Sequence, residues 1–125
     1  MPGHKDWLQK SSGELRAARL LINDDVILDI AAFHAHQCAE KALKGYLMFQ
    51  RKSIPKTHNL EEILENCATL NQEFLNFLHD AIILDPYAIN TRYPDDRFKI
   101  DKFEVQKAIE HADRIFKFVQ NQITF

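Results

Sequence analysis

An uninterrupted helical repeat across residues 26–50 constrains the fold more than any other feature of the chain. The stretch contains no proline and one glycine, and its apolar residues recur at alternating spacings of three and four. This pattern predicts a single helix of roughly six or seven turns. Most residues on its apolar seam are small, so we expect a second helix to approach closely. The seam consists of Leu28, Ala31, Ala35, Cys38, Ala42, Gly45 and Phe49.

Polar residues gather on the opposite arc of the same predicted helix. Further apolar residues flank the seam, which lets more than one helix pack against it and indicates a central helix. The polar arc is therefore a narrow stripe between packed surfaces and a candidate functional surface. The stripe consists of His34, Gln37, Glu40, Lys41 and Lys44.

Length and composition indicate a soluble helical protein. The 125 residues predict one domain, 1–125, with 46% hydrophobic and 27% charged residues and only 3 glycines. A net charge of -2 gives no general electrostatic reason to bind nucleic acid or membranes, so a basic site must be local. The polar start and the lack of a membrane-length apolar run predict a cytoplasmic location. The two cysteines form no disulfide framework or metal motif, and Cys38 is expected to be a buried apolar residue.

Four further helices are expected around the central one. Asn59 and Glu62 form a capping-box pair ahead of one of them, and Asp101 and Glu104 form another. Asp24 or Asp25 can cap the central helix itself. The sum predicts an all-α, up-and-down bundle of four long helices plus one short helix. The predicted ranges are 5–22, 60–68, 71–84 and 102–120, the second being the short one.

Six histidines raise the question of a metal site, and their spacing argues against one. His34 and His36 are two residues apart, so they point in nearly opposite directions around a helix. His36 falls on the apolar side and is interpreted as a satisfied, partly buried core histidine. The sequence also contains no glycine-rich phosphate loop, no nucleophile elbow and no zinc signature. We therefore expect no metal, no cofactor and no enzyme chemistry of those familiar kinds.

Two polar regions remain as candidate binding sites, each with a structural alternative. Gln37, Lys41 and Lys44 recur at helical spacing and can meet phosphate, or they can form a solvated face held by Glu40–Lys44 pairing worth roughly 0.2–0.5 kcal/mol. The long irregular connection 85–100 holds the second region, as such loops are often functional.

Within that connection, Arg92 offers a planar fork for phosphate and Tyr93 a ring for stacking on a base. Alternatively both anchor the loop to the core, with Arg92 paired to an acidic neighbour. His58, next to the Asn59 cap, is either a packing residue or a pocket residue.

Three sequence elements together resemble a known family. The run Phe33-His34-Ala35-His36-Gln37-Cys38-Ala39-Glu40-Lys41-Ala42-Leu43-Lys44 resembles the central-helix signature of the HEPN domain. The runs Thr57-His58-Asn59-Leu60 and Arg92-Tyr93-Pro94-Asp95 are similar to two further family elements and follow in the same order. The resemblance spans most of the chain.

The resemblance implies a bundle of four or five helices that is usually dimeric, is often encoded beside a small nucleotidyltransferase and is proposed to bind nucleotides. Many members of the family are ribonucleases or toxins that use an arginine and a histidine separated by four to six intervening residues. After Arg92 those positions hold Arg97, Phe98 and Lys99, so the usual histidine is missing and an enzyme is not favoured. Arg97 or His58 is a possible substitute from elsewhere in the fold.

These considerations give one primary hypothesis and two alternatives. The primary one is a HEPN-type module that binds a nucleotide or RNA and acts with a nucleotidyltransferase partner. The alternatives are a HEPN-type ribonuclease toxin of a toxin–antitoxin pair and a purely structural partner-binding bundle. A homodimer is expected because three apolar residues, Ile30, Phe33 and Met48, fall near the polar arc. The expected ligand-binding residues are Gln37, Lys41, Lys44, His58, Arg92 and Tyr93.

Overall fold

The computed structural model describes residues 3–89 and 100–123, and the segments described are helical apart from short connections. Three helices are long and two are short, and short 3-10 turns (η) adjoin them. This confirms the predicted all-α bundle. The elements are α1 (His4–Leu21), η1 (Asp25–Ile27), α2 (Leu28–Phe49), α3 (Leu60–Ala68), η2 (Gln72–Phe77), α4 (Leu78–Leu84), η3 (Asp85–Tyr87) and α5 (Lys102–Ile123).

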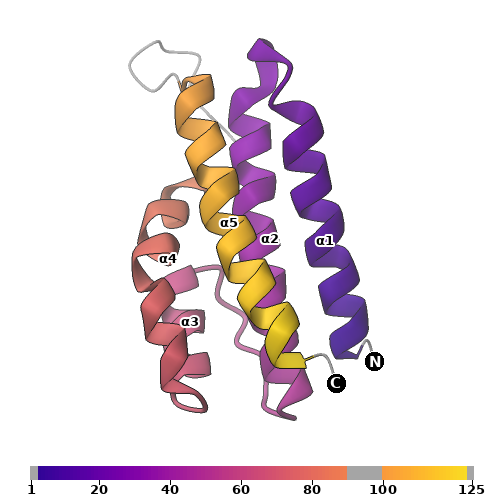
Figure 1. Ribbon diagram of the computed structural model, residues 1–125, viewed down its shortest axis with the longest axis vertical. Helices are drawn as coiled ribbons and strands as arrows, with labels where there is room; N and C mark the ends of the chain where they lie inside the picture. The colour runs from indigo at the N-terminus through magenta and orange to yellow at the C-terminus, as the bar shows by residue number, and fades with distance from the viewer. Residues whose placement is uncertain (1–2, 90–99, 124–125) are drawn as a thin grey trace.

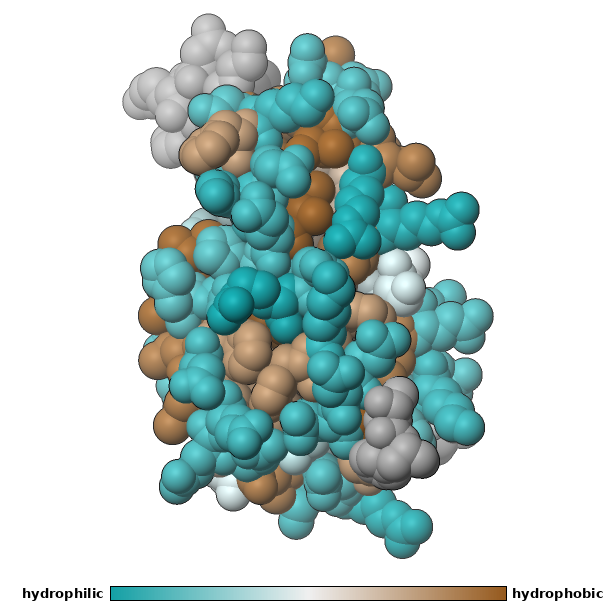
Figure 2. Space-filling model, viewed as in Figure 1, coloured by the Kyte–Doolittle hydropathy of each residue, from teal (hydrophilic) through white to brown (hydrophobic). Residues whose placement is uncertain are grey.

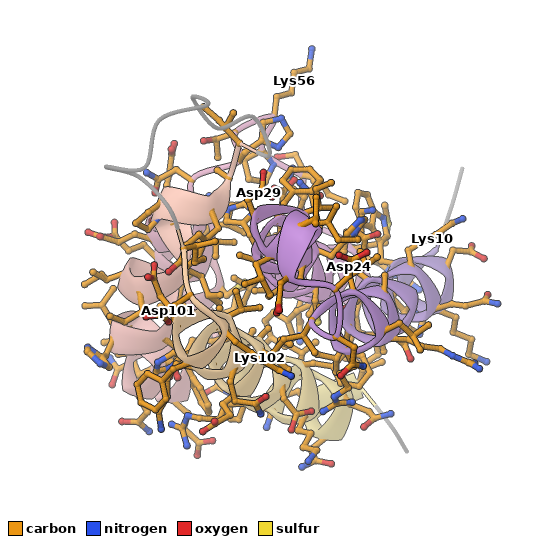
Figure 3. All side chains as sticks on the ribbon, turned by 90° about the horizontal axis from the view of Figure 1, so that it is seen from above. Lys10, Asp24, Asp29, Lys56, Asp101 and Lys102 are labelled. Carbon is orange, nitrogen blue, oxygen red and sulfur yellow. The ribbon has the colours of Figure 1, made fainter. Side chains whose placement is uncertain are left out.

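Helix α2 occupies the middle of the bundle (Figure 1). It packs antiparallel to α1 on one side and against α5 on another, while α3 and α4 cover the remaining side. After α2, the chain climbs back along the bundle before α3 begins, so that α5 finally runs in the same direction as α2. Seen from above, the other helices surround α2, and Lys56 of the returning linker points outward (Figure 3).

The small residues of the α2 seam allow α1 to approach closely, as predicted. A Cβ atom built on Gly45 would lie 3.0 Å from the Cβ of Trp7 in α1, a tighter spacing than ordinary side-chain contacts. Farther along the same interface, the buried Ser11 hydroxyl donates a hydrogen bond to the backbone carbonyl of Cys38 at 2.7 Å. Cys38 is fully buried, which confirms the interpretation of this cysteine as a core residue.

The predicted caps form at the starts of α3 and α5, whereas α2 itself begins after Ile27 without a side-chain cap. The Asn59 side chain accepts from the Glu62 amide at 2.9 Å at the start of α3. The Asp101 side chain accepts from the Glu104 amide at 2.7 Å at the start of α5. The Asp24 side chain caps the 3-10 turn that leads into α2, by accepting from the Val26 amide. Local hydrogen bonding of this kind satisfies amides that have no partner within their own helix.

The helix predicted for residues 71–84 is shorter than expected. Residues Gln72–Phe77 form a 3-10 helix, and only Leu78–Leu84 are α-helical. The Asn71 side chain accepts from the Glu73 amide, which starts the tighter turn, and Phe74 is then fully buried. Packing of Phe74 against the rings of Tyr46 and Phe118 stabilises the 3-10 conformation relative to a continuous α-helix.

Across the described ranges 3–89 and 100–123, none of the helices combines the length and the apolar character needed to span a lipid bilayer.

Candidate functional site

The carboxylate of Glu40 lies at the centre of a buried group of charged residues on α2. Glu40 and Lys44 are only 4% and 6% exposed. The Lys44 ammonium donates to Glu40 Oε2 at 2.9 Å, one helical turn away. The His58 imidazole, from the linker before α3, contacts the two carboxylate oxygens at 2.9 and 3.1 Å through Nδ1. Because a carboxylate only accepts, His58 carries a proton on Nδ1 and donates to Glu40.

Two further residues extend this group into the core. His36 is fully buried, with Nδ1 3.8 Å from Glu40 Oε1 and Nε2 3.9 Å from Asp85 Oδ1. Both separations exceed hydrogen-bonding distance, and neither ring nitrogen has a hydrogen-bond partner within the described residues. Asp85 accepts from the backbone amides of Leu60 and Glu61 at 2.7 and 3.4 Å. We call Glu40, Lys44, His58, His36 and Asp85 the buried charge cluster.

The cluster fixes the first turn of α3 against α2. Asp85, at the end of α4, supplies a carboxylate to the amides that open α3, and a negative charge there also complements the helix dipole. His58 precedes the same turn and is hydrogen-bonded to α2. The sequence elements 33–44 and 57–60 therefore lie next to one another in space.

The surroundings shift the pKa values of two members of the cluster. Burial raises the pKa of the Glu40 carboxyl, but hydrogen bonds from Lys44 and His58 outweigh burial and hold that pKa below its usual value. Burial lowers the pKa of His36, and the nearby carboxylates of Glu40 and Asp85 oppose the shift only in part. The cluster therefore pairs an ionised Glu40 with a neutral His36 at neutral pH.

The other lysine of the predicted stripe faces a different neighbour. Lys41 Nζ lies 3.5 Å from Glu14 Oε2 on α1, and His34 Nδ1 lies 3.3 Å from Glu14 Oε1. Gln37, half-buried, falls on the helix between this pairing and that of Lys44. The polar stripe is thus divided into two charge-compensated groups, one facing α1 and one facing the linker before α3.

Two structural interpretations from the sequence need correction. The Glu40–Lys44 pair exists, but it is buried rather than part of a solvated face, because the linker carrying His58 returns over it. His36 was expected to be satisfied and partly buried. It is completely buried, and its ring nitrogens have no hydrogen-bond partner in the described chain.

Of the six expected ligand-binding residues, the structure brings Lys44 and His58 together through Glu40. The His58 side chain remains 68% exposed beyond this contact. Arg92 and Tyr93 lie outside the described residues.

Sequence reasoning placed Glu40 in the polar stripe but not among the expected ligand-binding residues, and it did not single out Glu14 or Asp85. The spacing of Glu40 and Lys44 was a usable signal for Glu40. No sequence signal pointed to the hydrogen bond between Asp85 and the start of α3, because it joins residues far apart in the chain.

The fold and this cluster define a small all-α module built around one buried helix. The chain belongs to the HEPN family, as the family model described as "HEPN domain" matches residues 4–122.

Two solved structures have similar folds over nearly the full length of both chains. One is ST0689, an archaeal HEPN homologue, with a TM-score of 0.80, 25% identity, and coverage of 99% of this chain and 100% of that one. The other is TT1696 from Thermus thermophilus, with a TM-score of 0.79, 30% identity, and coverage of 97% and 98%. A comparison with curated proteins gave no match.

Proposed function

We propose that this chain is a cytoplasmic HEPN-type binding module of one domain, which recognises the phosphate of a nucleotide or RNA and acts with a nucleotidyltransferase partner. One observation carries the proposal: two family elements meet at Glu40 and leave an exposed imidazole at their junction. His58 is oriented by a buried carboxylate, and its second ring nitrogen, Nε2, can donate to a phosphate oxygen when the ring is protonated.

The remaining proposed ligand residues have distinct roles around His58. Arg92 would bind phosphate oxygens in a bidentate manner, and Tyr93 would stack on a base. Lys41 and Gln37 would contact the same ligand from the outer side of α2. Lys44 would act indirectly, because its ammonium is paired with Glu40 and holds the carboxylate that orients His58.

A titration of binding tests this proposal. Calorimetry with ATP, GTP and a short single-stranded RNA should show saturable binding by the wild-type protein. His58→Ala and Arg92→Ala should each weaken it about tenfold or more, since each removes a hydrogen bond to a charged group. Lys107→Ala is the matched control, because Lys107 is an exposed cation on α5 paired with Glu110. Absence of binding by wild type at millimolar ligand would contradict the proposal.

The ribonuclease alternative is favoured by one specific feature, the Glu40–His58 pair. A carboxylate that holds Nδ1 leaves Nε2 of the imidazole free to act as a general base. In RNA cleavage it would accept the 2′-hydroxyl proton as the 2′ oxygen attacks phosphorus, then return that proton to the departing 5′ oxygen. Cleavage of single-stranded RNA in the presence of a chelator, lost in His58→Ala, would establish this alternative over the non-catalytic module.

A homodimer and a nucleotidyltransferase partner complete the proposal. Ile30, Phe33 and Met48 on α2 are only partly buried within one chain, and a second copy would cover them. Light scattering should give twice the chain mass at micromolar concentration, and Phe33→Asp should reduce it to the single-chain mass. Co-purification with a nucleotidyltransferase encoded by an adjacent gene tests the partner.

A further inference from the structure

A second buried carboxylate organises basic side chains on the opposite part of the bundle, between α4 and α5. Asp80, in the first turn of α4, is 3% exposed. Its Oδ1 atom lies 2.6 Å from Nδ1 of His111 and accepts a hydrogen bond from Nε of Arg114 at 3.0 Å. His111 and Arg114 are three residues apart on α5 and therefore share a face. One oxygen thus fixes an imidazole and a guanidinium side by side.

The outward-facing atoms of these two side chains remain available. Arg114 is 58% exposed, and its hydrogen bond to Asp80 is made through Nε, at the inner edge of the guanidinium. The guanidinium lies over the ring of Phe77, 5.2 Å from its centroid, which restricts its plane. His111 is 20% exposed. The centroids of the His111 and His79 rings lie 5.7 Å apart, in an edge-to-face arrangement. Figure 2 shows hydrophilic side chains beside apolar ones on this face of the bundle.

Neighbouring acidic residues do not neutralise this group. On α5, Glu110 is paired with Lys107 at 3.6 Å, and Asp113 is paired with Lys117 at 2.9 Å. Asp80 is therefore the only carboxylate within the described residues that contacts Arg114 or His111. The charge of Asp80 balances that of Arg114, so the group carries a net positive charge when His111 gains a proton.

We propose that His111 and Arg114, positioned by Asp80, form a binding site for a phosphate group on the α4–α5 face. The planar fork of Arg114 matches two oxygens of a phosphate, and Nε2 of His111 supplies a third donor when the ring is protonated. His79 lies beside His111 at the edge of the same site. This site is separate from the His58 site and does not depend on the function proposed for it.

The histidine and arginine side-chain signals of ¹⁵N-labelled protein report directly on this site. Inorganic phosphate, a mononucleotide and a short single-stranded RNA are titrated separately at low ionic strength, where surface electrostatics are least screened. We expect the His111 and Arg114 signals to shift saturably. Stronger binding of RNA than of phosphate identifies a nucleic-acid backbone as the source of the phosphate group, and the reverse order identifies a free phosphate or monoester.

Variants separate a binding site from a structural ion pair. Arg114→Ala should weaken binding about tenfold, as expected for loss of a charged hydrogen bond, and Arg114→Lys should restore only part of it. Lys117→Ala, which removes an exposed lysine one turn away, should change the affinity less than about twofold. Circular dichroism confirms that each variant is folded.

The experiment is repeated in a His58→Ala background, so that failure of the His58 site does not affect the result. No shift of the His111 or Arg114 signals at millimolar phosphate and RNA, or equal affinity of Arg114→Ala and wild type, would overturn the proposal.

Discussion

His58 donates a hydrogen bond to Glu40 across 2.9 Å, and this contact joins the linker before α3 to the middle of α2. The two residues belong to different sequence elements, 33–44 and 57–60. Glu40 is buried and His58 is largely exposed, so the pair connects the core of the bundle with its surface. The stability of the fold and the orientation of the proposed binding residue therefore depend on the same carboxylate.

Removing the Glu40 carboxylate should destabilise the fold. Glu40→Ala leaves the Lys44 ammonium buried without its partner, and breaking a buried pair in this way costs about 3 kcal/mol of unfolding free energy. Urea denaturation measures the change. The control is Glu110→Ala, an exposed member of a surface pair, which should change stability by less than about 0.5 kcal/mol. Equal effects of the two substitutions would show that the buried cluster contributes no more than a surface pair.

The buried His36 should make the protein less stable in mild acid. Its folded pKa lies below the ordinary value of 6.5, so the unfolded chain binds a proton first as the pH falls. Stability is then present above pH 6.5 and is lost as the pH falls towards the folded pKa. His36→Gln removes this group. Between pH 8 and 5 the urea midpoint of the wild type should therefore fall by more than that of the variant. Parallel pH curves would contradict the assignment.

A second loss of stability should follow at lower pH from Glu40. Its folded pKa lies below the ordinary 4.5, so its contribution is complete above pH 4.5 and disappears as the pH falls through the folded pKa. Glu40→Gln should abolish this lower phase of acid unfolding. Persistence of the phase in that variant would assign it to other carboxylates.

Replacing two helical glycines with alanine should change the stability of the protein in opposite directions. Gly13→Ala on α1 meets no atom within 4 Å and should stabilise the protein by about 0.5–1 kcal/mol through helix propensity. Gly45→Ala on α2 would place a Cβ 3.0 Å from that of Trp7 and separate the two helices. Overpacking of about 1–3 kcal/mol should exceed the propensity gain, giving a net loss. Thermal unfolding compares the two, and stabilisation by both would refute the close approach.

Both cysteines should resist thiol reagents in the native protein. Burial raises the pKa of Cys38 and of Cys67 to about 12, so almost no reactive thiolate exists at pH 8. Labelling with a thiol-specific reagent should be slow in buffer and rapid in urea. Fast labelling of Cys38 in the folded protein would indicate that the α1–α2 interface opens readily, and fast labelling of Cys67 would indicate the same for the α2–α3 interface.

The sequence predicted the structure correctly where the structure depends on residues close together in the chain. The range predicted for α3 matches the observed helix, because the Asn59 cap is set within a single turn. The pairing of Glu40 with Lys44 also follows from their spacing along one helix. The burial of that pair did not follow, since it results from the return of the His58 linker over α2.

Long-range relationships account for the remaining differences. The 3-10 path through Gln72–Phe77 depends on how Phe74 packs against rings from α2 and α5. The capping of α3 by Asp85 and the convergence of His111 and Arg114 on Asp80 each join separate helices. Sequence periodicity describes one helix at a time and carries no information about these partners.

The central claim is that His58, oriented by Glu40, contacts the phosphate of a nucleotide or RNA. The most direct measurement is the NMR signal of the His58 imidazole during titration with a short single-stranded RNA, in wild type and in Glu40→Gln. We predict a saturable shift of the His58 signal in wild type and about tenfold weaker binding in the variant, since the neutral amide orients the ring less firmly. An unchanged His58 signal at saturating RNA would contradict the claim.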